Sequence, residues 1–312
     1  MKPTLAVDVA GLRLPTPVMI ASGCFSSSRE LMGLLDLRKV GGIVMRTITL
    51  DPDLGPPAPR MAETPSGLLS ATGLQNPGVD AFIDELPALT KTGIPIVASI
   101  GGRSVDEFKR VTARLVALRT VQGLEVNLSC ANEAQDGRPF AGDVVRAGEV
   151  IAAVAGISRV PVFAKLSVDG VDVVEMAKQC IGSGARGLTL VNSIAGLAID
   201  TESSRPKLAA GAGKLSGPAI KPLALLAVYR VAEAIPEASI IGVGGIATAQ
   251  DALEFMAAGA SAVQVGTAMF TNPSAPVDVA VGIGRYLVEH RLPSPDALRG
   301  RAHERPEEKA EA

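Results

Sequence analysis

The chain has 312 residues, of which 47% are hydrophobic and 20% charged, and its formal net charge is −2 at pH 7. This length can bury one large core or two smaller ones, and a near-neutral chain without a basic stripe is a poor nucleic-acid binder. The three cysteines are odd in number and widely spaced, which argues against a disulfide framework, so we expect a protein of the reducing cytoplasm. Both histidines lie near the C-terminus, which argues against a histidine triad and a multi-histidine metal site.

The sequence carries no segment that we expect to enter a membrane. Its apolar amino terminus is interrupted by Lys2, Asp8 and Arg13, which makes a poor signal peptide. The longest run without charge, Met256–Val277, contains two glycines and two prolines and does not have the pattern of a membrane span.

Eight short apolar runs, rich in β-branched residues, follow one another along the chain. Near-continuous apolarity is typical of strands that are buried on both faces, as in a parallel sheet. The predicted strands are Val18–Ser22, Gly42–Thr47, Ile94–Ile100, Leu124–Ser129, Pro161–Leu166, Gly187–Asn192, Ser239–Gly245 and Ala262–Thr267.

Helical patterns lie between most of these strands, and several end near a glycine, a usual stop signal. The predicted helices are Val105–Val121, Asp143–Ala155, Val171–Gly182, Pro222–Ala234, Thr248–Ala258 and Val277–His290. Alternation of strand and helix through eight units indicates an α/β fold, the (β/α)8 barrel, with a doubly wound open sheet as the alternative.

Two connections are too long for a minimal barrel. One runs from about Ile48 to Gly93 and the other from Ala195 to Lys221, and both leave the carboxyl-terminal face, where barrels place their active sites. Loops of this length are usually lids or substrate walls, so we expect these insertions to cover a site. Insertions without a role are the alternative.

A cysteine flanked by two asparagines ends the fourth predicted strand. Asn127 and Asn132 offer paired donors and acceptors, which suit a planar polar ring, and the thiol of Cys130 could move a proton beside it. With an unperturbed or slightly lowered pKa this thiol would serve as a base near neutral pH. The alternative is that Cys130 is a small buried hydrophobe.

Two further features point to an anionic ligand. Glycines follow the seventh and eighth strands, at 240–246 and 263–267, where backbone N–H groups can approach a phosphate. Lys165 lies in an otherwise apolar strand, where a buried ammonium needs a partner such as an anion or an electron-rich ring. It could instead reach solvent at the rim, or serve a flavin-free barrel lyase through a Schiff base.

Taken together and in order, several motifs resemble the class 1 dihydroorotate dehydrogenases, which are FMN-dependent barrels of pyrimidine biosynthesis. They are residues 21–25 (ASGCF), 73–78 (GLQNPG), 126–130 (VNLSC), 164–166 (AKL), 191–193 (VNS), 215–222 (LSGPAIKP), 242–245 (GVGG) and 265–267 (VGT). The residues of these motifs are most similar to those of the NAD-linked class 1B catalytic subunit, which pairs with an iron–sulfur flavoprotein subunit.

That resemblance implies a single FMN-binding barrel domain over residues 1–303. The remaining segment, 304–312, is short and charged, and we expect it to be a disordered tail. The same resemblance implies a homodimer or a heterotetramer with the iron–sulfur/FAD electron-transfer subunit. The sequence itself shows no cysteine cluster for an iron–sulfur centre and no separate dinucleotide fold, so if NAD is the final acceptor a partner must supply the route.

The resemblance also implies a role for each site residue. Cys130 would take the C5 proton of dihydroorotate while a hydride passes from C6 to flavin N5, and Lys165 would stabilise negative charge on the reduced ring. The implied cofactor-binding residues are Ala21, Ser22, Gly23, Arg46, Thr47, Ser99, Asn127, Lys165, Val191, Gly217, Gly244, Gly245, Gly266 and Thr267. The implied substrate-binding residues are Arg46, Ser70, Ala71, Thr72, Gly73, Leu74, Asn127, Asn132, Asn192 and Ser193.

The chain departs from the family pattern at four positions. Arg46 stands where the family has a lysine, Ser70 and Ser99 replace asparagines, and Ala131 replaces the proline after the catalytic cysteine. A guanidinium is larger and planar, and a hydroxyl lacks the paired donor and acceptor of an amide. An FMN oxidoreductase acting on another dihydropyrimidine or cyclic amide is therefore the alternative function.

Overall fold

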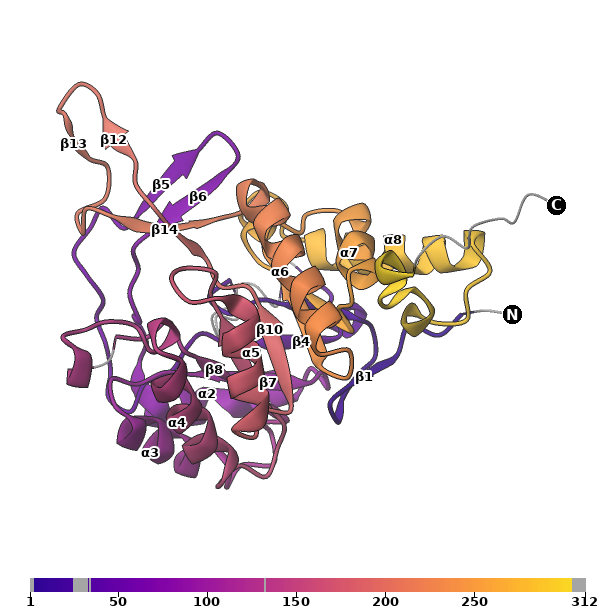
Figure 1. Cartoon of the computed structure of the whole chain (residues 1–312), viewed down its shortest axis with the longest axis horizontal. Coiled ribbons are helices and arrows are strands. Elements are labelled where there is room, and N and C mark those ends of the chain that lie inside the picture. The colour runs from indigo at the N-terminus through magenta and orange to yellow at the C-terminus, as the bar shows by residue number, and fades with distance from the viewer. Residues whose placement is uncertain (1–2, 25–32, 34, 132, 305–312) are drawn as a thin grey trace.

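The computed structural model describes residues 3–24, 33, 35–131 and 133–304, and its centre is a closed barrel of eight parallel strands (Figure 1). Around the barrel the order is β10, β15, β16, β3, β4, β7, β8 and β9. The strands are β3 (Val18–Ile20), β4 (Gly42–Val44), β7 (Ile96–Ile100), β8 (Gly123–Asn127), β9 (Val162–Leu166), β10 (Gly187–Leu190), β15 (Ser239–Val243) and β16 (Ala262–Val265). The predicted (β/α)8 barrel is confirmed, and the open sheet is wrong.

Helices surround the barrel and cover its outer face. They are α2 (Gly78–Thr90), α3 (Val105–Leu115), α4 (Val144–Ala155), α5 (Val173–Gly182), α6 (Lys221–Ala234), α7 (Ala249–Ala257) and α8 (Ala275–Glu289). Several begin at a side chain that caps their free N–H groups: Asp143 caps α4, Asp172 caps α5, and Thr248 with Asp251 forms a capping box on α7. The caps fix where each strand-to-helix loop ends.

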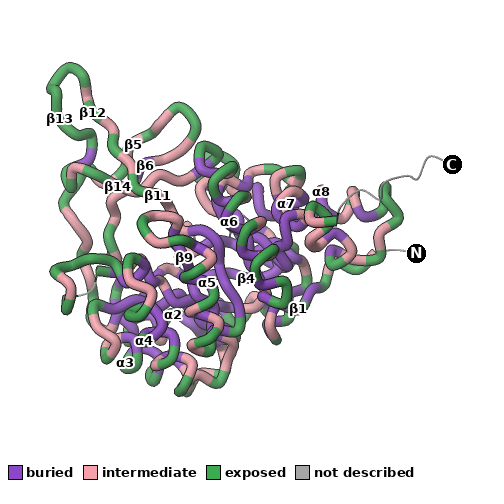
Figure 2. Tube along the Cα trace, in the orientation of Figure 1, coloured by how far each residue is buried: buried purple, intermediate pink, exposed green. Residues whose placement is uncertain are grey.

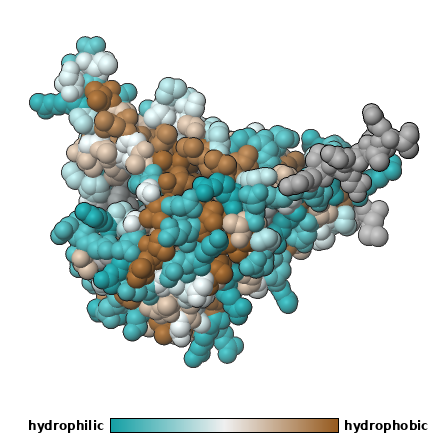
Figure 3. Space-filling model, in the orientation of Figure 1, coloured by the Kyte–Doolittle hydropathy of each residue, from teal (hydrophilic) through white to brown (hydrophobic). Residues whose placement is uncertain are grey.

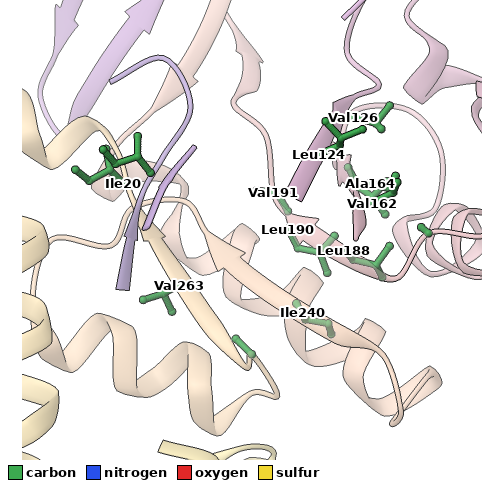
Figure 4. Packing of buried hydrophobic residues seen from close by; sticks show 14 of the residues in the cluster. Ile20, Leu124, Val126, Val162, Ala164, Leu188, Leu190, Val191, Ile240 and Val263 are labelled. Carbon is green, nitrogen blue, oxygen red and sulfur yellow. The ribbon is translucent and has the colours of Figure 1, made fainter. Parts of the chain in front are cut away.

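The strands contribute to two separate cores because their side chains alternate in direction. Leu124 and Val126 of β8 belong to the large cluster between barrel and helices, as do the other labelled residues of Figure 4. Glu125 and Asn127, which alternate with these two residues along β8, therefore face the barrel interior. Figure 2 shows the strands as the most deeply buried part of the chain.

An antiparallel hairpin closes the amino-terminal end of the barrel. It consists of β1 (Val7–Val9) and β2 (Leu12–Leu14), and its apolar side chains pack against inward-facing residues near the strand starts, among them Met19, Val97 and Phe163. We call this group, with Val44, Ile241 and Ala262, the floor cluster. The lower barrel interior is therefore filled, and the large cavity lies at the opposite end.

The two long connections build a second, smaller sheet above the barrel. Its order is β11 (Ile194–Gly196), β14 (Gly213–Ser216), β6 (Gly67–Ser70) and β5 (Met61–Thr64), and the short pair β12 (Ile199–Asp200) and β13 (Arg205–Pro206) extends from it. Figure 1 shows these strands projecting from the barrel body, and Figure 2 shows that the β12–β13 tip is exposed. The sequence analysis predicted neither these strands nor α2.

Some predicted elements run longer than the observed ones at their carboxyl ends, whereas others, such as the helices predicted to end at Ala155, Gly182 and Ala234, end as predicted. The strand predicted to Ser129 ends at Asn127, because the Asn127 side chain accepts a hydrogen bond from the Ser129 N–H and turns the chain. The helix predicted to Val121 ends at Leu115, where a turn closes from Leu118 N–H to the Leu115 carbonyl. The predicted tail lies outside the described residues apart from Glu304. Of the helices described, none has the length and hydrophobicity needed to cross a membrane.

Candidate active site

A cavity of about 900 Å³ opens between the carboxyl ends of the barrel strands and the small sheet. Nearly all of the predicted site residues line it: Ala21, Ser22, Gly23, Arg46, Thr47, Ser70, Ala71, Thr72, Gly73, Leu74, Asn127, Cys130, Lys165, Val191, Asn192, Ser193, Gly217, Gly244, Gly245, Gly266 and Thr267. Two are not among these residues: Ser99 is fully buried behind the wall, and Asn132 lies outside the described residues.

A chain of polar side chains runs along one wall of the cavity. Ser99 Oγ lies 2.9 Å from Thr47 Oγ1, which also accepts a hydrogen bond of 3.1 Å from Asn127 Nδ2. Asn192 Nδ2 donates to Asn127 Oδ1 at 3.2 Å and to Ser129 Oγ at 3.0 Å. Because each amide is held by the next, their orientation is set before any ligand binds. Ser99 thus contacts Thr47 rather than the cavity.

Cys130 lies at the base of this wall and is 1% exposed. A Cβ added at Gly101 would approach the Cys130 sulfur to 2.9 Å, so the glycine makes room for the thiol. Burial raises the pKa of Cys130 to about 12, the backbone N–H of Gly102 opposes the shift, and the Glu107 carboxylate adds to it. The expectation of an unperturbed or lowered pKa is therefore wrong, because the thiol is far more desolvated than a strand end suggested.

The opposite wall is organised by Arg46. Its Nη1 donates a 2.7 Å hydrogen bond to the carbonyl of Gln75, whose side-chain oxygen accepts a 2.8 Å bond from Arg60 Nη1. Asn76 ties the same loop to Thr49 by donating to its Oγ1 at 2.7 Å. The guanidinium at position 46 thus fixes the loop that carries the predicted substrate residues 70–74.

The floor of the cavity carries a buried ion pair. Lys165 Nζ lies 3.0 Å from Glu125 Oε1, and the other Glu125 oxygen accepts a 2.9 Å hydrogen bond from Gln264 Nε2. The lysine side chain is 8% exposed and the glutamate 1%. Lys165 therefore does not snorkel to solvent, and its partner is within the protein. Glu125 was not predicted, although it carries the same signal as Lys165, a charged residue inside an otherwise apolar strand.

Glycines form the far end of the cavity. Gly217, Gly244 and Gly245 have φ values of +94°, +125° and +76°, which side chains rarely adopt. A Cβ at Gly245 would lie 2.7 Å from the Cβ of Lys221 and 3.0 Å from the Gly217 carbonyl. The glycines thus permit these backbone conformations and the close packing of the Gly217 and Gly245 segments. All three line the end of the cavity, where backbone N–H groups could bind an anion.

Several charged residues on the cavity rim were not predicted. Asp53 and Arg103 line it and lie 3.7 Å apart, and Lys214 of β14 forms a 2.6 Å ion pair with Asp169. No local sequence signal marked them, because their positions beside the cavity depend on how segments remote in the sequence come together. Of the other cysteines, Cys24 lines the cavity and Cys180 is buried in α5.

Comparison with known proteins decides the family. A sequence profile described as dihydroorotate dehydrogenase matches residues 4–287. The chain belongs to this family. Its members are oxidoreductases that act on a CH–CH bond, and the family implies a flavin cofactor.

Three relatives of this family are similar over most of their length, and each is named dihydroorotate dehydrogenase B (NAD(+)), catalytic subunit. The protein from Geotalea uraniireducens is 47% identical over 292 residues, which is 93% of this chain and 95% of the relative. That from Citrifermentans bemidjiense is 46% identical over 300 residues, 96% and 98% of the two chains. That from Geobacillus kaustophilus is 46% identical over 270 residues, 86% of each. The class 1B resemblance is confirmed.

Proposed function

We propose that the chain oxidises dihydroorotate to orotate in pyrimidine biosynthesis, with FMN as its flavin and Cys130 as its base. The observation that carries this proposal is one cavity in which a buried thiol, a row of fixed amides, a buried cation and a glycine-lined end occur together. The names of the relatives support the same substrate.

The cavity fits a flavin mononucleotide in size and in chemistry. A volume of about 900 Å³ is at the upper end of small-molecule sites, as a three-ring cofactor with a phosphorylated side chain requires. The residues proposed to hold it are Gly217, Gly244, Gly245, Gly266 and Thr267 at the phosphate and ribityl end, and Ala21, Ser22, Gly23, Thr47, Lys165 and Val191 along the rings. When bound, FMN supplies the hydride acceptor.

The protein itself orients the substrate and moves its proton. Asn127 and Asn192, already fixed to each other, would hold the amide edges of the pyrimidine, together with Ser193 and Asn132. Cys130 Sγ would take the proton from C5 of the dihydropyrimidine. Lys165 would offset the negative charge that the reduced ring gains. Ser99 is still predicted to belong to the cofactor site, where it would act through its hydrogen bond with Thr47 and not from the cavity wall.

A related substrate is the second candidate, and Arg46 is the observation that favours it. Its guanidinium is committed to the Gln75 carbonyl, so the wall it forms differs from one built on a lysine. The flavin-free lyase has no such support, because a Schiff-base nucleophile must be a neutral amine and Lys165 is paired with a carboxylate.

The electron route is proposed to pass through a partner subunit that carries an iron–sulfur centre and FAD. The relatives' names, which specify a catalytic subunit and NAD(+), support this. Apolar side chains are exposed at the cavity, where Phe270 lies, and at the projecting β12–β13 pair, where Leu197 and Ile199 lie. Figure 3 shows hydrophobic residues on this projection. Co-purification from the native source, with assays for iron and FAD, tests the partner; a homodimer alone would contradict it. A cytoplasmic location stays a prediction.

The activity can be tested on the purified chain. We expect a yellow protein that releases FMN on denaturation and whose flavin absorbance bleaches when dihydroorotate is added without oxygen. Bleaching by another dihydropyrimidine or cyclic amide, and not by dihydroorotate, would favour the second candidate. A colourless protein that cannot be loaded with FMN would overturn the proposal.

A further inference from the structure

The Lys165 ion pair is one half of a polar bridge across the barrel. Glu125 lies on β8 and Gln264 on β16, four strands apart in a closed ring of eight and therefore on opposite sides. The Glu125 carboxylate accepts from Lys165 with one oxygen and from Gln264 with the other. Side chains from both walls thus meet around a single carboxylate.

This carboxylate is almost completely shielded from solvent. Glu125 is 1% exposed, lies one inward-facing position below Asn127 on β8, and sits above the apolar floor cluster. A buried carboxylate without a paired cation costs several kcal/mol, and an unpaired ammonium is equally unfavourable. Each of the two charges is therefore stable only in the presence of the other.

The other groups near Lys165 do not replace Glu125 as its counter-charge. The neighbouring strand β10 presents Thr189 beside it, which is uncharged. Cys24 lies in the field of both Lys165 and Arg46, but burial raises the pKa of its thiol to about 11, so it remains neutral at physiological pH. Arg46 is itself cationic and disfavours a second positive charge.

We propose that Glu125 is a positioning residue that keeps the Lys165 ammonium charged and directed at the cavity floor, with Gln264 holding the far side of the carboxylate. This inference rests on the proposed function, because it concerns the cation that the proposed function places beside the bound flavin. It deepens that function by tracing the reduction potential of the flavin to a residue that does not line the cavity.

Glu125→Gln tests the proposal, because the amide keeps the size of the side chain and removes its charge. The measurement is the midpoint potential of bound FMN in the variant minus that in the wild type, between about pH 6 and pH 9. At low pH we expect a positive difference, since one negative charge is missing. At high pH we expect a negative difference, since the unpaired Lys165 loses its proton and no longer stabilises the reduced flavin.

Two matched variants separate this role from a structural one. Glu125→Asp keeps the charge, so its potential should run parallel to that of the wild type at all pH values. When Lys165→Met with Glu125→Gln is compared with Lys165→Met alone, the difference in midpoint potential should not change sign between about pH 6 and pH 9. A Glu125→Gln difference that is constant with pH, or one that changes sign without Lys165, would overturn the proposal.

A second measurement applies if Glu125→Gln does not fold. Lys165→Met leaves the Glu125 carboxylate unpaired, so the folded state should take up a proton there. Its free energy of unfolding, relative to wild type, should then rise as the pH falls from about 8 to 6, and Lys165→Met with Glu125→Gln should not show this rise. Equal pH dependence in both would contradict the pairing.

The proposed function and this inference fail in different ways. If the wild-type chain cannot be loaded with FMN, the proposed function is wrong, and the unfolding experiment still tests the Glu125–Lys165 pair. If the wild type binds FMN and is bleached by dihydroorotate while Glu125→Gln follows the wild-type potential, only the inference is wrong.

Discussion

The upper and lower halves of the barrel interior are built on the same strands yet have opposite character. On β9, Phe163 points into the floor cluster, and Lys165, two residues later, points into the cavity floor. On β16, Ala262 and Gln264 are related in the same way. Side-chain alternation thus lets one short strand contribute to stability at one end and to chemistry at the other.

This division explains why the site can contain costly features. The buried ion pair carries a desolvation cost, and the three glycines at positive φ lose much conformational entropy on folding. The floor cluster, whose residues do not line the cavity, supplies compensating apolar burial. Mutations in the two halves should therefore affect different measurements.

Cys130→Ala should have the largest effect, and it should be confined to the upper half. Without the thiol no group at that position can take the substrate proton, so reduction of bound flavin by dihydroorotate should slow by about 100- to 10,000-fold. Stopped-flow absorbance measures it, with the FMN dissociation constant as the control, which should stay near that of the wild type. A rate close to wild type would remove Cys130 from the mechanism.

Phe163→Ala should produce the converse result. The ring is 1% exposed in the floor cluster, so its removal should lower the free energy of unfolding by about 3–5 kcal/mol. Chemical denaturation measures the loss. The rate of flavin reduction per FMN-loaded molecule should hardly change, and a loss like that of Cys130→Ala would show that the two halves are coupled.

The pH dependence of the rate should come from the upper half alone. The thiolate is the active base, and burial raises the pKa of Cys130 to about 12, so the thiolate fraction grows as the pH rises toward that value. The second-order rate of flavin reduction should therefore increase by about tenfold per pH unit below about pH 9. Phe163→Ala should show the same slope. A plateau already reached near neutral pH would contradict the prediction.

The barrel could be predicted from the sequence because its strands are buried on both faces. That burial demands continuous apolar runs, and the centres of all eight were located. Helix α2 was missed because it begins at Gly78 with positive φ and contains Pro87, both of which are usual helix breakers. The small sheet was missed because β6 and β14 pair across the chain, with Leu69 opposite Leu215, and no local pattern encodes such pairing.

The candidate site divides in a similar way. Cys130, Asn127 and Lys165 were predicted because each is polar where its strand is otherwise apolar or is ending. The burial of Cys130 was not predicted, because it depends on the close approach of a neighbouring strand end at Gly101, which is remote in the sequence. Ser99 was placed on the cavity by resemblance, yet its hydroxyl is bonded to Thr47 behind the wall.

The ladder between β6 and β14 has a kinetic consequence. Lys214, Leu215 and Ser216 pair with Ser70, Leu69 and Leu68, so the insertions that follow the second and sixth barrel strands share backbone hydrogen bonds. Neither can swing away from the cavity mouth without breaking those bonds or carrying the other with it. We therefore expect any opening of the cavity mouth to move both insertions together, about the points where they leave β4 and β10 on opposite sides of the barrel.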